Sequence, residues 1–250
     1  MKFEGPPQPQ QEETEKEKGE SMNVAIESTR IDKEAKLTAI RQEVDSWGDR
    51  LGEGVDEGIK ETVAVYNAME LPTSASCEGH FESESEHGFP VPWIEVEAPN
   101  KPQWRFEREE EIYNQVAKKY GITVDQVMHA DNDEAWKEAV RLSAEQEETA
   151  EYKAWEEENE KLFTKVESLL QEFYKERNVS DELRIIADRS VGGFRVHGGG
   201  KFYIPNNQKE RLQSELTDAE RKRIPEVLRS SQEEMKAFTE FLQNKYFEAK

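Results

Sequence analysis

The sequence has a single cysteine, Cys77, and no apolar run close to the roughly 20 residues that a membrane helix needs. One cysteine excludes an intramolecular disulfide. Residues 1–19 also lack the apolar stretch of a secretory signal. We therefore expect a cytoplasmic protein with no membrane partner.

Apolar residues are scarce for a chain of this length. Only 34% of the 250 residues are hydrophobic, whereas 36% are charged. That ratio is poor for one compact core. We expect a smaller core that carries solvated helices, and a disordered tail over 1–28, where Pro6-Pro7-Gln8-Pro9 disfavours both helix and sheet.

Positive charge is also in deficit, because the formal net charge is -21. Nucleic-acid affinity rests largely on Lys and Arg releasing counterions from phosphates, so this balance disfavours a nucleic-acid partner. Anionic membranes are repelled for a similar reason. The most evident basic run is Arg221-Lys222-Arg223, and a solvated helix face is its simpler interpretation.

Helical spacing of apolar residues accounts for most of the chain. It predicts helices over about 30–47 and 54–70, and helical structure again from about 106. One helix there starts near Asp133, and its apolar content thins between 143 and 153. Either one long helix with an exposed middle or two helices in series fits this pattern.

Further helix signals lie at caps and breaks. Thr123 is placed to cap a short helix, and Asp131 to cap the helix that follows. Thr217 and Glu220 have the spacing of a capping box. Pro225 predicts a kink or a new helix start near the C-terminus.

Short alternating segments predict a small sheet. The expected strands lie near 73–77, 92–97, 183–188 and 194–204. Helices 54–70 and 155–176 would cover them. The predicted fold class is α+β and helix-rich, a small antiparallel or mixed sheet packed by helices, with long acidic helical extensions.

Four regions follow from this reading. They are a disordered acidic, Pro- and Gln-containing tail (1–28), a helical hairpin with a two-stranded module (29–105), an acidic helical insertion (106–155), and the helix, strands and C-terminal helices that complete the core (156–250).

One segment concentrates residue types that carry chemistry. Cys, Glu, Gly and His converge in Ser76-Cys77-Glu78-Gly79-His80, and a tryptophan stands on the returning strand. The candidate ligand-binding residues are Thr73, Ser76, Cys77, Glu78, Gly79, His80 and Trp93.

Two interpretations assign chemistry to this turn. Cys77 and His80 have C-x-x-H spacing, and thiolate and imidazole are good zinc ligands. His87 offers a third ligand, and a fourth would have to come from Glu82, Glu84 or Glu86. Alternatively, Cys77 is a nucleophile with His80 as its base, although the sequence shows no third, orienting residue.

Two further interpretations need no chemistry. The hydroxyls of Thr73, Ser74 and Ser76, with the N–H groups of a glycine turn, can hold an anion or carboxylate. Trp93 would then offer a stacking face, and His197 would approach from a neighbouring strand. In the last interpretation the turn only orders the sheet, and the acidic helices bind a protein partner.

The motif resembles that of a bacterial protein family. Thr73-Ser74-Ala75-Ser76-Cys77-Glu78-Gly79-His80 followed by Pro92-Trp93-Ile94-Glu95-Val96 is similar to the T-S-x-S-C-x-G-H turn and P-W-[IV]-x-[IV] strand of uncharacterised proteins, many from candidate-phyla genomes. With Ile59-Lys60-Glu61-Thr62-Val63 the resemblance covers about 40 residues. It identifies a module and implies no activity.

A weaker similarity links the turn to the wybutosine-synthesis methyltransferases, whose signature is S-S-C-x-G-R. Ser76-Cys77-Glu78-Gly79 matches, but His80 stands where that family has Arg, and Ala75 replaces the adjacent Ser. The leading hypothesis is thus a binding or regulatory module for a small molecule or peptide, with its site at this turn. The alternative is an enzyme centred on Cys77 and His80, metal-dependent or nucleic-acid-modifying. The sequence indicates no particular cofactor.

Overall fold

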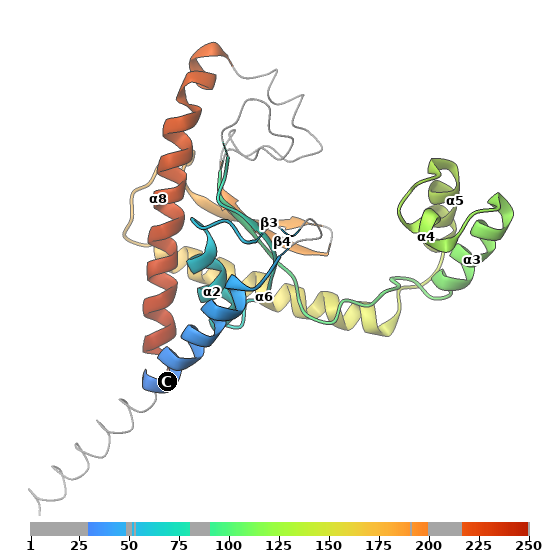
Figure 1. Ribbon diagram of the computed structural model, residues 1–250, viewed down its shortest axis with the longest axis horizontal. Coiled ribbons are helices and arrows are strands. Elements are labelled where there is room, and N and C mark those ends of the chain that lie inside the picture. The colour runs from blue at the N-terminus through green and yellow to red at the C-terminus, as the bar shows by residue number, and fades with distance from the viewer. Residues whose placement is uncertain are drawn as a thin grey trace, which may run out of the picture.

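A computed structural model describes residues 30–48, 52, 54–80, 91–190, 192–199 and 217–249 (Figure 1). Within these ranges a four-stranded sheet packs against helices, and a small helical lobe stands apart from them. The predicted helix-rich α+β class is confirmed. Across the same ranges, none of the helices combines the length and the apolar character needed to cross a membrane.

The sheet is antiparallel throughout, which decides between the antiparallel and mixed alternatives. Its strands are β1 (Thr73–Cys77), β2 (Trp93–Val96), β3 (Ile185–Ser190) and β4 (Gly193–Gly198), in the order β1-β2-β4-β3. All four predicted strands are present; β1 has the predicted bounds and the other three have shifted ends. The part of the last predicted strand beyond residue 199, including Phe202-Tyr203-Ile204, lies outside the described residues.

Alternation along the central strands gives the sheet two different faces. One face is apolar, and it carries Ile94 and Val96 of β2 and Phe194 and Val196 of β4, all fully buried. It packs on the long helix α6 (Ala150–Tyr174), where the rings of Phe163 and Phe194 meet edge to face at 5.3 Å. The opposite face carries Trp93, Glu95, Arg195 and His197.

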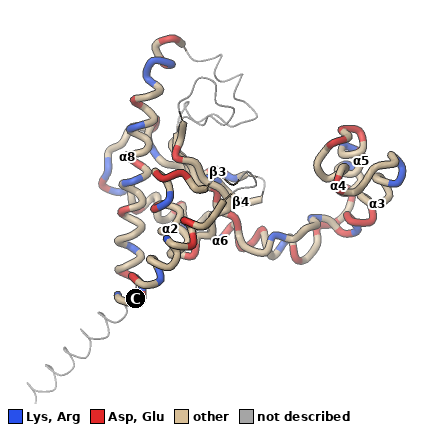
Figure 2. The backbone as a smooth tube through the Cα atoms, in the orientation of Figure 1, with Lys and Arg blue, Asp and Glu red and all other residues tan. Residues whose placement is uncertain are grey.

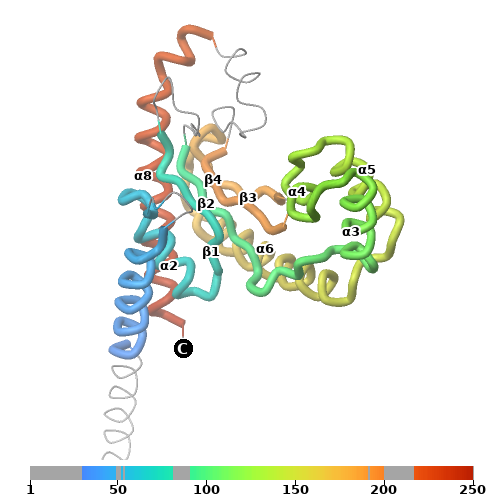
Figure 3. The backbone as a smooth tube through the Cα atoms, turned by 45° about the vertical axis from the view of Figure 1, so that its right-hand side comes forward, coloured from blue at the N-terminus to red at the C-terminus, as the bar shows by residue number. Residues whose placement is uncertain are grey.

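The second long helix, α8 (Asp218–Glu248), runs beside α2 (Lys60–Ala68) in two views of the backbone (Figures 1 and 3). Phe238 is fully buried against Tyr66. The hydroxyls of Thr62 and Thr239 share a buried 2.8 Å hydrogen bond at the same contact. Phe238 and Thr239 therefore lie on the buried side of α8.

The predicted start of the second helix is wrong, and one of the two alternatives at Pro225 is excluded. The second helix begins at Lys60, not at 54, because residues 54–59 form a loop that contains Gly54 and Gly58. Near the C-terminus, α8 continues through Pro225, which excludes a new helix start there and leaves the predicted kink as the other alternative. Thr217 makes the predicted capping box with Glu220. The helix over 30–47 is confirmed for residues 30–45.

The lobe is built from three short helices. They are α3 (Glu109–Tyr120), α4 (Val124–Met128) and α5 (Asp133–Ser143). They have a small core of their own: Ile112, Tyr113, Val116, Ala117, Val127, Ala135 and Ala139. Asn132, rather than the predicted Asp131, caps α5. The predicted cap at Thr123 is confirmed.

The region 133–174 consists of two helices in series, which settles the choice that the sequence left open. Residues 144–149 separate α5 from α6, and the Thr149 side chain caps α6 by accepting from the Tyr152 N–H. Segment 105–107 pairs with segment 147–149 through the bonds Glu107 N to Glu147 O and Thr149 N to Arg105 O. This two-stranded stem carries the lobe away from the sheet (Figure 1).

Charge is spread over the helices rather than separated by sign (Figure 2). Acidic and basic side chains are interspersed along α6 and α8, and some form short-range pairs such as Lys161 with Glu158 in α6 and Lys245 with Glu248 in α8. Exposed pairs of this kind stabilise a helix only slightly. The acidic helices are therefore solvated surfaces over a limited core.

A buried clamp joins the end of β2 to α6. The Trp155 Nε1–H donates to the carbonyl of Ala98 at 2.8 Å, and the Ala98 N–H donates to Asn159 Oδ1 at 2.7 Å. Both backbone groups of one residue are thus satisfied by side chains one helical turn apart. The clamp fixes where the chain leaves the sheet.

Replacing Asn159 by Ala should therefore destabilise the protein. The change leaves the buried Ala98 N–H without its acceptor, which costs about 1–3 kcal/mol in the free energy of unfolding. Urea denaturation followed by circular dichroism measures the loss. Glu157→Ala, on an exposed face of the same helix, is the matched control and should change the free energy far less; equal losses would contradict the clamp.

Candidate metal centre

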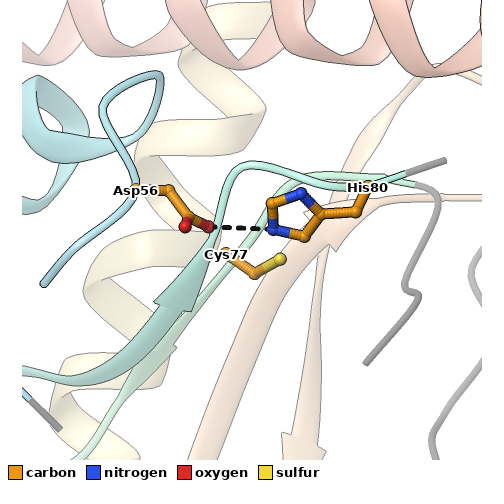
Figure 4. A group of neighbouring side chains, drawn as sticks. All are labelled: Asp56, Cys77 and His80. Carbon is orange, nitrogen blue, oxygen red and sulfur yellow. Dashed lines mark hydrogen bonds and ion pairs between the residues drawn. The ribbon is translucent and has the colours of Figure 1, made fainter. Parts of the chain in front are cut away.

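The predicted turn lies at the end of β1, beside the loop that precedes α2. Cys77 is the last residue of β1, and Glu78, Gly79 and His80 follow it. Asp56 comes from the loop and points its carboxylate at His80 (Figure 4). Asp56 and Cys77 are 21 positions apart in the sequence, and the fold brings their two segments together here.

Backbone and side-chain hydrogen bonds lock the loop to the turn. Asp56 Oδ2 accepts from the Glu78 N–H at 3.0 Å and lies 3.2 Å from His80 Nε2. In return, Glu78 Oε2 accepts from the Gly58 N–H at 2.7 Å. A Cβ at position 58 would stand 2.6 Å from the same Glu78 oxygen, so a larger residue there would displace that carboxylate. The position of Asp56 is thus fixed from two sides.

Cys77 approaches the same point from inside the protein. It is only 8% exposed and contacts Trp93, which stands directly opposite it on β2. The Gly79 N–H donates to Cys77 Sγ at 3.3 Å. One ligand atom from each of Asp56, Cys77 and His80 lies within 4.8 Å of the others.

Helix α8 supports the turn from behind. The Gln232 side chain donates to the carbonyl of Glu78 at 3.0 Å. Gly79 has a φ of +85°, and a Cβ there would stand 2.7 Å from a methyl carbon of Leu228 and 2.9 Å from the carbonyl carbon of Val91. Both its backbone conformation and its close packing therefore require glycine.

The thiol is held in its protonated form by its surroundings. Burial raises the pKa of Cys77 to about 11, and the carboxylates of Asp56 and Glu78 act in the same direction, against the hydrogen bond from Gly79. A catalytic thiolate normally has cationic neighbours that lower its pKa. The electrostatics of this turn are thus the reverse of those around an activated nucleophile.

The remaining predicted site residues divide into near and distant ones. Trp93 touches Cys77, as described above. Thr73 is at the other end of β1, where its hydroxyl accepts from the Asn67 side chain at 2.8 Å. Ser76 is opposite Ile94, which puts it on the other face of the sheet from Cys77. The structure therefore groups Cys77, Glu78, Gly79, His80 and Trp93, and separates Thr73 and Ser76 from them.

His197 does not join the group. It stands opposite Trp93 on β4, so a whole strand separates it from Cys77. It is buried, with Nε2 3.1 Å from Asp188 Oδ2 and Nδ1 2.7 Å from the carbonyl of Gly198. Burial lowers its pKa. His87 and the three acids Glu82, Glu84 and Glu86 lie outside the described residues.

Asp56 is the residue that the sequence did not reveal. Val55 and Ile59 continue the helical spacing of α2, so Asp56 is easily taken for an exposed helical residue. The available signal is the density of glycines at 52, 54 and 58, which is unfavourable for helix. A polar residue inside such a stretch belongs to a loop and is free to reach a neighbouring segment.

Comparison with known proteins yields no relative: no family model, curated protein or solved structure matches the chain. Among the described residues, the Asp56–Cys77–His80 group is the feature from which a function can be inferred.

The packing at Gly79 predicts a difference between two glycines that both have positive φ. Gly121→Ala should cost only the backbone strain of about 1–2 kcal/mol, since a Cβ there meets nothing within 4 Å. Gly79→Ala should cost a further 1–3 kcal/mol or so from overpacking. Urea denaturation of both variants tests this, and equal losses would contradict the crowding.

A second prediction concerns the thiol. With a pKa of about 11, roughly one Cys77 in ten thousand is a thiolate at pH 7. Iodoacetamide should label the native, chelator-treated protein about 100-fold more slowly than the urea-unfolded chain. Labelling is followed by intact mass. Equal rates in the two states would show an exposed, activated thiol instead.

Proposed function

We propose that the protein is a binding module whose ligand at the Cys77–His80 turn is a divalent transition-metal ion, with Zn²⁺ best suited to the donor set. The observation that carries the proposal is the meeting of one carboxylate, one thiol and one imidazole within 4.8 Å. Thiolate sulfur, imidazole nitrogen and carboxylate oxygen are the donors that zinc takes in proteins.

The spacing of the donors suits an ion between them. At zinc–ligand distances near 2.0 Å, two donors at corners of a tetrahedron are about 3.3 Å apart. Asp56 Oδ2 and His80 Nε2 are separated by 3.2 Å. Without an ion, the same two atoms are close enough to share a hydrogen bond. The two side chains therefore keep the same arrangement with and without the metal.

Electrostatics support the same choice. The two carboxylates that raise the pKa of Cys77 are unfavourable neighbours for a bare thiolate, but they favour a cation. A bound dication stabilises the thiolate and the Asp56 carboxylate together. The proposal thus gives a reason for placing a buried cysteine among acids.

Nucleophilic catalysis by Cys77 is the competing candidate. One observation favours it, because Asp56 supplies the orienting partner for His80 that a catalytic triad needs. The raised pKa of Cys77 disfavours it more strongly, since the thiol stays protonated at neutral pH. Metal binding accounts for both observations.

The proposal predicts about one zinc per chain after purification without chelators, measured by elemental analysis. Cys77→Ser and His80→Asn should each weaken zinc binding by at least about 100-fold, which exceeds the usual loss from removing a ligand's supporting contact. Competition with a chromophoric chelator gives the affinities, and circular dichroism checks that the variants fold.

His129→Asn is the matched control. His129 pairs with Asp125 at 3.3 Å on the lobe surface, which reproduces the His–Asp pair without a cysteine. Its loss should leave zinc content unchanged. A wild-type content below about 0.2 zinc per chain, after attempted reloading with excess zinc, would overturn the proposal.

A further inference from the structure

The described part of the chain supplies three ligands to the proposed centre, while zinc usually takes four. Over the part of the chain that the structure describes, no fourth His, Cys, Asp or Glu joins the group of Asp56, Cys77 and His80. Sites with three protein ligands leave one coordination position to water or to a ligand from solution. The count therefore favours an exchangeable position.

Solvent reaches the group from one side. Cys77 is buried, but the side chains of His80 and Asp56 keep 37% and 31% of their surface exposed. The Cys77 sulfur is therefore on the buried side of the centre, and His80 and Asp56 are on its solvent-exposed side. A small molecule can approach the ion without any unfolding of the turn.

Charge limits which molecules bind there. One thiolate and one carboxylate balance the two charges of the ion, so the loaded centre has no net positive charge. Glu78 adds a negative charge that acts on Cys77. Lys60, the nearest basic residue along the chain to the Asp56 loop, is already engaged with Asp45 and Glu57. The local field therefore repels anions.

We propose that the fourth position of this centre takes an uncharged nitrogen or oxygen donor and discriminates against anionic ligands. This inference rests on the proposed metal site and names the class of ligand that the site accepts. It differs from the sequence-based expectation of an anion or carboxylate in the glycine turn, because the surrounding acids oppose such a ligand.

Cobalt-loaded protein provides the test. Co²⁺ replaces Zn²⁺ in sites of this kind and gives a visible spectrum that responds to its ligands, together with a thiolate-to-cobalt charge-transfer band. Imidazole at about pH 8, where it is uncharged, is the neutral probe and azide is the anionic one. Imidazole should change the visible spectrum at a concentration about tenfold lower than azide does.

The outcomes separate the two proposals. Absence of the charge-transfer band, or its persistence in Cys77→Ser, overturns the metal site itself. A normal charge-transfer band with a visible spectrum that neither probe changes shows a closed centre, which overturns the exchangeable position. Azide binding as tight as imidazole overturns the discrimination by charge.

Glu78→Gln isolates the electrostatic part. The amide oxygen can still accept from the Gly58 N–H, so the turn keeps its support while the negative charge is lost. Azide affinity should rise roughly threefold and imidazole affinity should stay the same. Glu151→Gln, an exposed acid in the first turn of α6, is the charge-matched control and should change neither; an unchanged azide affinity in Glu78→Gln contradicts the electrostatic argument.

Discussion

Burial of the apolar face of the sheet against α6 is the constraint on which the other features depend. Apolar residues are only about a third of the chain, and one buried cluster includes Phe163, Phe194 and Phe238. This burial determines which side chains of β2 face the core. The pairing of β1 with β2 then places Cys77 opposite Trp93. Cys77 therefore reaches its position through the pairing of strands rather than through its own local turn.

The centre itself depends on contacts of a different kind. Asp56 reaches the turn from a loop, and the bonds that hold it run in both directions between loop and turn. Without a cation these groups put two carboxylates beside a thiol, an arrangement that folding alone does not favour. Clusters of this type tend to occur where a function needs them.

Periodic features of the chain were predictable from sequence, and contacts between distant segments were not. The strands, the capping box at Thr217 and the C-x-x-H turn follow from local pattern, and the structure contains each of them. Asp56 was missed because Val55 and Ile59 imitate helical spacing, while its partner is 24 residues away at His80. The projection of the lobe likewise depends on pairing across residues 105–149, which no local pattern encodes.

The stem of the lobe has a consequence for how the architecture can vary. Segments 105–107 and 147–149 run side by side, so the chain leaves and rejoins the main body at nearly one point. Ala98, which follows β2, is hydrogen-bonded to Trp155 and Asn159 of α6, and these contacts lie between the stem and the sheet. The connection between β2 and α6 therefore does not involve the three lobe helices. Insertions with adjacent ends are readily lengthened, replaced or lost. The stem therefore marks the place where this architecture can change size while the sheet and its turn stay the same.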